Sequence, residues 1–306
     1  MNSKEYTLTR LSKESLTAVE QLYEAVYGHR PAAHFFDRKY DTAYTGVSYI
    51  GYIAWNREQL PVAFYAVTPC LLQYEGSVIL SAQSTDTMTH PDYRFKGMFM
   101  ELSRLTFILC MESGIRLIFG FPNQNSYPGA IRMGWKETET MDCFIIPVNT
   151  LPLEYLTRKW TLYKKLILKK YLTPQAGIPN SSIAAGFAGI EREDAYLQYK
   201  KYSATQVIQI GKSKLWIKIN NALIIGDMEQ VDASNFDSVI LATKKIAGRL
   251  GIRKIFFQSS PATTLHQLFN SRYTPIPSFP ILFYDLGIED IRLEKIKFTF
   301  SDIDIF

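Results

Sequence analysis

The stretch that most constrains the fold runs from Val78 to Gly114. It begins as an apolar run typical of a strand, passes through a polar turn, and from Gly97 onward repeats apolar residues at roughly helical spacing. These apolar positions are Phe99, Leu102, Leu105, Phe107, Leu109 and Cys110. Glu101, Ser103 and Arg104 fill the other side. We therefore predict a strand, a glycine turn and a long amphipathic helix in direct succession.

The turn at residues 94–99 indicates an anion site. It would place several unpaired backbone N–H groups at a helix N-terminus, and Gly97 lacks a Cβ at the point of closest approach. Arg94 and Lys96 add two positive charges to the loop, which favours a phosphate over a carboxylate ligand. Because a single glycine between basic residues is weak evidence, an ordinary solvated turn at a helix start is the alternative interpretation.

The segment HPDYRFKG, residues 90–97, resembles the acyl-CoA pyrophosphate loop of the GNAT N-acetyltransferase superfamily, written Arg/Gln-x-x-Gly-x-Gly/Ala. Arg94 and Gly97 match its first two fixed positions, whereas Phe99 departs from the third. Residues 117–121 are similar to the fifth strand of the family and 125–135 to its fourth helix, so the resemblance covers about residues 5–148. It implies acetyl-CoA as co-substrate. The implied cofactor-binding residues are Thr87, Met88, Thr89, Arg94, Phe95, Lys96, Gly97, Met98, Phe99 and Asn125.

With 306 residues, the chain is long enough for two domains. The first half predicts strands at 6–11, 48–55 and 60–72 and a helix at 14–27. The second half repeats the plan of the first with strands at 206–210, 214–219, 222–228, 254–258 and 281–285 and helices at 236–250 and 263–269. The predicted fold class is α/β (α+β), with two GNAT-like domains that are each a mixed, mostly antiparallel sheet flanked by helices.

The expected boundaries are 1–150 for an acyl-CoA-binding domain, 151–190 for a basic helix and linker, and 191–306 for a degenerate second domain. The second domain is expected to have lost CoA because its turn at 229–236 has no glycine and contains Glu229 and Asp232, which would repel a pyrophosphate.

Residues 158–172 hold six basic and no acidic residues beside an apolar stripe. Such a helix can lie on an anionic membrane surface, but a mid-chain position favours an interdomain helix that packs its stripe and snorkels its lysines. We expect no stable membrane association. The following residues, 174–189, have the composition of a linker or surface loop.

Composition restricts the class of ligand. A net charge of +5 suits an anionic ligand such as CoA without requiring nucleic acid. Cys70, Cys110 and Cys143 form no Cys-x-x-Cys pair, and the four histidines show no ligand spacing, so neither a disulfide framework nor a metal is expected. Because the N-terminus lacks the apolar core of a signal peptide, and no apolar run reaches the length of about 18 residues needed for a span, we expect a cytoplasmic protein.

Acyl transfer from a thioester to an amine needs a deprotonated amine, a polarised carbonyl and a protonated or stabilised thiolate. The resemblance puts Gln83 where relatives often have a catalytic Glu, and Gln83 cannot act as a base. Asp86 is the nearest carboxylate, and alternation puts it on the strand face opposite Gln83. A strand-end acid that caps the turn is at least as good an interpretation of Asp86. Ala130 occupies the position of the acid in relatives, and Tyr127, one helical turn earlier, is the candidate replacement.

The last residues, Phe298–Phe306, contain acids and end in a carboxylate. Some two-domain relatives bring such a carboxylate to the acceptor site, so this segment is a second candidate source of a base. An exposed tail is the alternative.

The sequence therefore predicts an acyl-CoA-dependent N-acyltransferase that transfers an acetyl group directly to a small-molecule amine, with amino sugars among the candidate acceptors. Two alternatives stay open. One is a catalytically inactive CoA-binding sensor, and the other is a Fem-like aminoacyl transferase, against which the intact CoA loop argues. Neither the acceptor nor the oligomeric state can be predicted.

Overall fold

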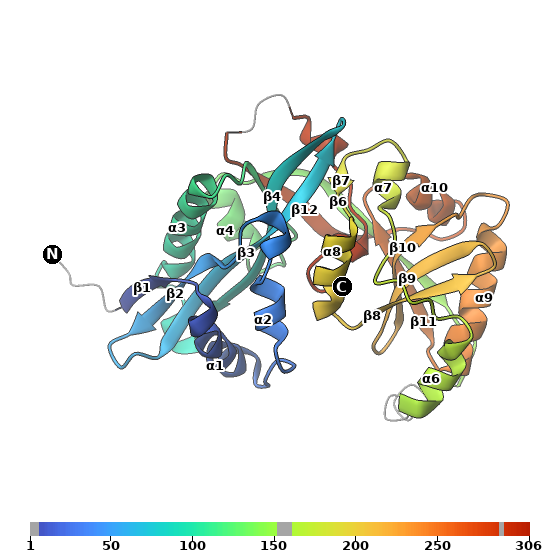
Figure 1. Ribbon diagram of the computed structural model, residues 1–306, viewed down its shortest axis with the longest axis horizontal. Helices are drawn as coiled ribbons and strands as arrows, with labels where there is room; N and C mark the ends of the chain where they lie inside the picture. Colours follow the sequence, from blue (N-terminus) through green and yellow to red (C-terminus); the bar gives the residue numbers. More distant parts are fainter. Residues whose placement is uncertain (1–5, 152–160, 288–290) are drawn as a thin grey trace. The chain divides into compact units, whose positions relative to one another are not determined.

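The structure is a computed structural model that describes residues 6–151, 161–287 and 291–306 (Figure 1). The chain divides into two compact units, and both are discontinuous in sequence. Unit 1 comprises Met1–Leu72, Ser77–Thr138 and Ile281–Ile291, and unit 2 comprises Gln73–Gly76, Glu139–Pro280 and Arg292–Phe306. The sequence predicted contiguous domains instead, and the difference arises from the strands that complete each sheet.

In unit 1 the strand order is β1-β2-β3-β4-β5-β12. The strands are β1 (Tyr6–Arg10), β2 (Ile50–Asn56), β3 (Pro61–Tyr74), β4 (Ser77–Thr89), β5 (Leu117–Gly120) and the end of β12 (Ile276–Asp285). The helices are α1 (Leu16–Tyr27), α2 (Phe35–Tyr40), α3 (Met98–Glu112) and α4 (Tyr127–Arg132). β1, β2 and β3 pair antiparallel, β4 pairs parallel with β5, and β5 pairs antiparallel with β12.

Two apolar cores lie on opposite faces of the unit 1 sheet. Alternation along β3 sends Ala63, Tyr65 and Val67 into the core under α3, and Phe64 and Ala66 into the core under α1 and α2. Figure 1 shows α3 and α4 on one side of this sheet and α1 and α2 on the other. Because both faces are covered, β3 is apolar at nearly every position and carries little visible alternation in its sequence.

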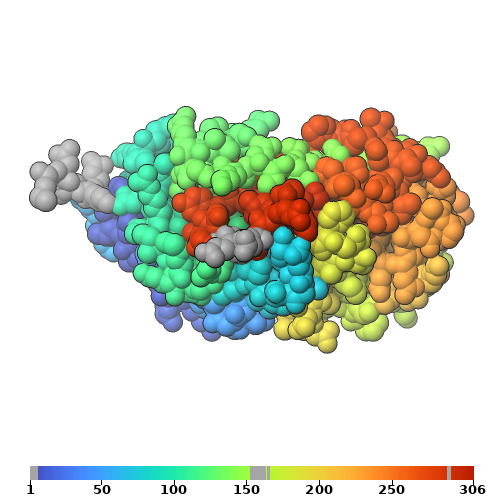
Figure 2. All heavy atoms as spheres, turned by 90° about the horizontal axis from the view of Figure 1, so that it is seen from above, coloured from blue at the N-terminus to red at the C-terminus, as the bar shows by residue number. Residues whose placement is uncertain are grey.

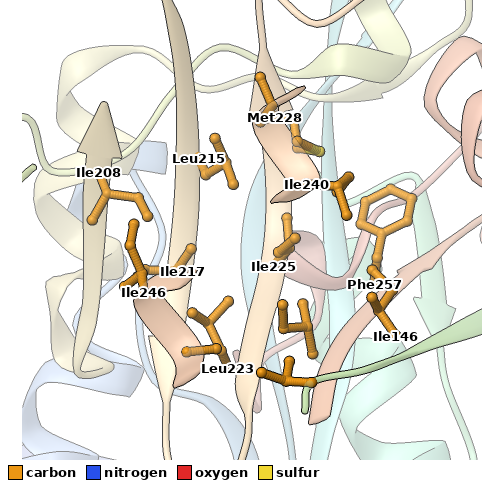
Figure 3. Packing of buried hydrophobic residues seen from close by; sticks show 14 of the residues in the cluster. Ile146, Ile208, Leu215, Ile217, Leu223, Ile225, Met228, Ile240, Ile246 and Phe257 are labelled. Carbon is orange, nitrogen blue, oxygen red and sulfur yellow. The ribbon is translucent and has the colours of Figure 1, made fainter. Parts of the chain in front are cut away.

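In unit 2 the strand order is β6-β11-β10-β9-β8. The strands are β6 (Lys136–Pro147), the short β7 (Gly189–Ile190), β8 (Thr205–Ile210), β9 (Ser213–Ile219), β10 (Leu223–Glu229) and β11 (Lys254–Ser259). The helices are α6 (Thr161–Lys169), α7 (Ser181–Ala184), α8 (Asp194–Tyr199), α9 (Phe236–Arg249) and α10 (Thr264–Asn270). Figure 3 shows the core between these strands and α9, to which Ile146, Ile208, Leu215, Ile225 and Ile240 contribute.

The two units share one order of elements. An antiparallel meander leads into a strand, a crossover helix and a parallel fifth strand, namely β2-β3-β4-α3-β5 in unit 1 and β8-β9-β10-α9-β11 in unit 2. The predicted fold class, with a mostly antiparallel sheet flanked by helices, is confirmed. The antiparallel neighbour of β5 is β12, from the end of the chain, and that of β11 is β6, from the middle. This pairing makes both units discontinuous.

The region between residues 158 and 189 differs in part from its prediction. α6 begins at Thr161, so residues 158–160 of the predicted basic helix lie outside the described residues. Leu168 is buried, and Ile167 and Tyr171 pack against the core of unit 2. Residues 174–189 do not form the expected surface loop, because Ile178 and Asn180 are buried and the Asn180 side-chain amide donates to the Ile190 carbonyl at 2.9 Å.

The segment Phe298–Phe306 is not an exposed tail, because most of its side chains are buried in unit 2. Figure 2 draws the last part of the chain, from β12 onward, in orange-red to red, and its visible atoms lie against other side chains. Asp302 accepts from Arg192 at 2.6 Å, and Arg192 also donates to Asp227 at 2.6 Å. All three side chains are fully buried.

This buried ion triad gives a stability prediction. Arg192→Met should lower the free energy of unfolding by about 3–5 kcal/mol, because it leaves two carboxylates buried without their cation. Arg30→Met is the matched control, since Arg30 donates to Glu24 at 2.7 Å at an exposed position and its loss should cost less than about 1 kcal/mol. Urea denaturation measures both, and equal effects would contradict the assigned role of Arg192.

Candidate functional site

The loop between β4 and α3 has the backbone geometry of an anion cradle. Phe95 and Gly97 have left-handed φ values of 64° and 77°, whereas Lys96 between them and Met98 after them are not in the positive-φ region. Alternation of this kind turns successive backbone N–H groups toward one side. The first regular helical hydrogen bond runs from Glu101 N to Gly97 O, so the amides of residues 98–100 precede the helical pattern.

Positive charge and open space accompany these amides. Arg94 and Lys96 are exposed, and Lys96 Nζ lies 4.8 Å from the centroid of the Tyr93 ring. A Cβ added at Gly97 would meet no atom within 4 Å, so a ligand can approach the backbone there. The Phe95 ring is fully exposed and contributes nothing to the core. The loop is therefore suited to a phosphate group in charge, geometry and access.

The loop lies at the point where two parallel strands part. β4 pairs with β5 only from Ser81 to Ser84, opposite Leu117 to Gly120, and β4 then continues to Thr89. Thr87, Met88 and Thr89 therefore follow the end of this pairing. The Met88 side chain is buried in the core under α1 and α2, so any contact of Met88 with a ligand would use its backbone.

Phe99, the departure from the loop pattern of the GNAT resemblance, has a packing role. A Cβ at Gly129 would lie 2.7 Å from Phe99 Cε1, so the ring rests on α4 at a position that only glycine permits. The same ring meets Tyr65 edge to face at 5.9 Å. Phe99 therefore joins the start of α3 to α4, and its side chain is committed to this contact.

Asp86 is engaged in an ion pair. Its carboxylate accepts from Lys39 Nζ at 2.8 Å and from the Tyr40 hydroxyl at 2.5 Å, and the Lys39 side chain is only 2% exposed. Both bonds are made to Oδ2, so the carboxylate is the counter-ion of a buried ammonium. Asp86 is also not the cap of a turn, which was the alternative from the sequence.

The expectation that Asp86 and Gln83 point to opposite faces is wrong. Ala82 belongs to the core under α3, and Ser84 Oγ lies 2.8 Å from the hydroxyl of Tyr65 in that same core. Asp86 instead reaches α2 on the other face. The alternation therefore shifts by one residue between Ser84 and Asp86. As a result, Gln83 and Asp86 share the α2 face.

Tyr127 and Asn125 lie at the start of α4. The Tyr127 hydroxyl donates to Glu137 at 2.5 Å, and this carboxylate raises the pKa of the phenol above its ordinary value, so the phenol stays protonated at neutral pH. Asn125 is exposed, and its backbone N–H donates to the Asn123 side chain at 2.9 Å. Ala130, in the position of the acid in relatives, is buried.

The sequence did not single out Lys39, Tyr40 or Glu137. A signal for Lys39 was present, because Phe36, Lys39 and Tyr40 are spaced i, i+3, i+4 and occupy the buried face of α2. Glu137 was not detectable, since its contact with Tyr127 depends on how α4 meets the first residues of β6. Among the described residues, no group of His, Cys, Asp and Glu could hold a metal ion. The described helices also include none long and apolar enough to cross a membrane.

Comparisons with known proteins define the class. The family model described as acetyltransferase (GNAT) domain matches residues 7–138. The fold is similar to a probable N-acyltransferase of unknown function from Enterococcus faecalis, at a TM-score of 0.62 and 14% identity over 92% of this chain and 73% of the other. No curated protein matches the sequence.

Two further solved structures share the fold. A GCN5-related N-acetyltransferase from Kribbella flavida has a TM-score of 0.57 and 12% identity over 92% of this chain and 72% of the other. A putative acetyltransferase from Pyrococcus horikoshii has a TM-score of 0.54 and 10% identity over 98% and 95%. The fold likeness thus extends through both units. The match of residues 7–138 to the GNAT acetyltransferase domain confirms, for that part of the chain, the resemblance predicted from the sequence.

The Asp86 ion pair gives a prediction that separates structure from catalysis. Asp86→Asn should lower stability by about 1–3 kcal/mol because it leaves the Lys39 ammonium buried without its charged partner. The double variant Asp86→Asn/Lys39→Met should regain most of that loss, since no buried charge is then unpaired. Thermal or urea unfolding of both variants measures the effect. A double variant less stable than Asp86→Asn would show that the ion pair is not the cause.

Proposed function

We propose that this protein is an acyl-CoA-dependent N-acyltransferase whose unit 1 binds acetyl-CoA and transfers the acetyl group directly to a small-molecule amine. The observation that carries the proposal is the loop at residues 94–97, with alternating backbone handedness and two basic side chains, at the end of the short β4–β5 pairing. In this proposal the amides of residues 96–100 and the Arg94 side chain hold the pyrophosphate.

The thioester would then lie along the end of β4, where residues 87–89 offer backbone groups beyond the β4–β5 pairing. Hydrogen bonds from a fixed backbone to the thioester carbonyl stabilise the charge that develops in the transition state. Tyr127 would supply the proton to the departing thiolate. Its phenol is neutral at physiological pH, and its single O–H, which donates to Glu137 in the structure, would turn to the sulfur. Amine and thioester held in contact account for much of the remaining acceleration.

The proposal assigns no carboxylate base in unit 1. Gln83 cannot accept the proton, and Asp86 is held by Lys39 and Tyr40. Direct binding of the fraction of acceptor that is already neutral is consistent with this arrangement. The same observation supports a second candidate function, a CoA-binding sensor without catalysis, and consumption of acetyl-CoA in the presence of an amine library distinguishes the two.

The site assignment is tested at Gly97. Gly97→Glu should abolish CoA binding, because it adds bulk and negative charge where phosphate would meet backbone N–H groups. Isothermal titration calorimetry with CoA is the measurement. Gly97→Asn is the first control, since Asn tolerates the left-handed conformation without adding charge and should retain much more affinity.

Gly114→Glu is the second control for this experiment. Gly114, with φ 80°, lies just after the other end of α3 and also has open space around its Cβ. It should show a similar conformational cost and unchanged CoA affinity. Unchanged CoA affinity in a folded Gly97→Glu protein would refute the site.

The role of Tyr127 is tested by a pH profile. Tyr127→Phe should lower kcat by about 10²- to 10⁴-fold with little change in CoA affinity, the usual contribution of proton transfer. Because Glu137 raises the pKa of the phenol, Glu137→Gln should lower that pKa. The loss of rate at alkaline pH should then begin at a lower pH than in the wild type. An alkaline limb that does not move in Glu137→Gln would remove Tyr127 from the mechanism.

A further inference from the structure

We infer that residues 298–306 fill, in unit 2, the position that corresponds to the proposed acyl-CoA cleft of unit 1. The inference concerns the architecture of unit 2 and holds whether or not unit 1 carries out acyl transfer. It begins from a match between the two units that goes beyond the order of their elements.

The central strands β4 and β10 behave alike. β4 pairs parallel with β5 up to Ser84, and β10 pairs parallel with β11 up to Ile225. Just after this point each strand shifts its alternation, between Ser84 and Asp86 in β4 and between Ile225 and Asp227 in β10. In each unit the aspartate after the shift holds a buried cation, Lys39 for Asp86 and Arg192 for Asp227. Gly226 therefore marks in unit 2 the place where β10 parts from β11.

The Phe306 ring occupies this place. A Cβ at Gly226 would lie 2.2 Å from Phe306 Cζ, so only glycine leaves room for the ring. Trp216, on the neighbouring strand β9, meets the ring edge to face at 5.5 Å. Phe306 is fully buried. Since Gly226 has no left-handed φ in the structure, contact with this ring is the reason it must be glycine.

Residues 298–302, which precede Phe306, lie next to the end of β11. Ser260 N donates to Phe298 O at 2.8 Å, and Phe298 N donates to Ser260 Oγ at 3.1 Å. An isolated antiparallel β-bridge pairs Thr299 with Ser259. The 3-10 helix Phe300–Asp302 contacts both β10 and β11. Ser259 and Ser260, which follow the pairing of β11 with β10, are thus paired with this segment.

Three successive carbonyls fix the rest of the segment. Lys200 Nζ donates to Ile303 O at 2.8 Å, the Tyr202 hydroxyl to Asp304 O at 3.0 Å, and Lys218 Nζ to Ile305 O at 2.7 Å. Together with the ion pair of Asp302 with Arg192, these bonds hold residues 298–306 inside unit 2. Where unit 1 has its basic loop, unit 2 has the acidic residues Glu229 and Asp232. Removal of residues 303–306 would therefore open the apolar space at Gly226 without creating a phosphate site.

The probe is therefore pantetheine, the uncharged part of CoA, with CoA itself for comparison. The indole N–H signals of Trp216 and Trp135 in ¹⁵N-labelled protein report on the two units, because Trp216 touches Phe306 and Trp135 lies 3.3 Å from the Cβ position of Gly120 at the end of β5. In the wild type, neither compound should shift the Trp216 signal. In a chain that ends at Asp302, which keeps the partner of Arg192, pantetheine should shift Trp216 and CoA should not.

Shifts of Trp216 in the wild type, or no response to pantetheine in the folded shortened chain, would overturn the inference. A response of Trp135 alone would indicate binding by unit 1 and not by unit 2. The two signals therefore test the proposed function of unit 1 and the inference about unit 2 independently. Phe269→Ala is the matched control, since it opens a cavity elsewhere in the unit 2 core and should leave Trp216 insensitive to pantetheine.

A thermal-unfolding cycle tests the same contact should the shortened chain not fold. Phe306→Ala should lower Tm by roughly 6 to 20 °C. Gly226→Ala should lower Tm in the wild type but not in the Phe306→Ala background, where the clash is gone. Gly248→Ala, whose Cβ would meet Val148 at an ordinary 3.7 Å, should not lower Tm in either background. Independent effects of Gly226→Ala and Phe306→Ala on Tm would contradict the inference that residues 298–306 fill this position.

Discussion

The parallel pairing of β4 with β5 is the constraint on which the rest of unit 1 depends. It spans only four residues of each strand, and β4 continues for five more. A parallel pair needs a crossover, and α3 supplies it, so the loop that starts α3 must lie at the end of β4 where the pairing has stopped. The β4 edge that β5 no longer covers, and the amides at residues 96–100 at the start of α3, are therefore consequences of one short strand pair.

The shift of alternation in each central strand has an electrostatic consequence. It turns Asp86 in unit 1 and Asp227 in unit 2 toward buried basic side chains. A buried charge is tolerable only when it is paired and hydrogen-bonded, so each aspartate stabilises a cation that would otherwise destabilise the fold. This explains why a carboxylate close to the proposed cleft is a poor candidate for a base: its charge is already committed to the packing of α2.

The two units share one order of elements but differ in the residues that follow the central strand. In unit 1, the turn after the central strand is basic and contains Gly97 with open space around it. In unit 2, the corresponding turn contains Glu229 and Asp232, and the space at Gly226 holds the Phe306 ring. At this position of unit 2 the chain itself fills the volume and pairs nearby backbone groups, which is favourable because voids and unpaired groups are costly.

The sequence by itself determined the local elements and the loop. Periodicity predicted α3 and the β8-β9-β10-α9-β11 series to within a few residues, because amphipathic pattern and turn residues are local properties. The loop at residues 94–97 was detectable for the same reason. Only the tertiary structure decided which strands complete each sheet, since β6 and β12 are both extended and their register with β11 and β5 depends on partners far along the chain. It also decided the fate of Asp86 and of residues 298–306, because a shift in one strand's alternation and a ring lying on Gly226 are relations between distant residues that no local pattern encodes.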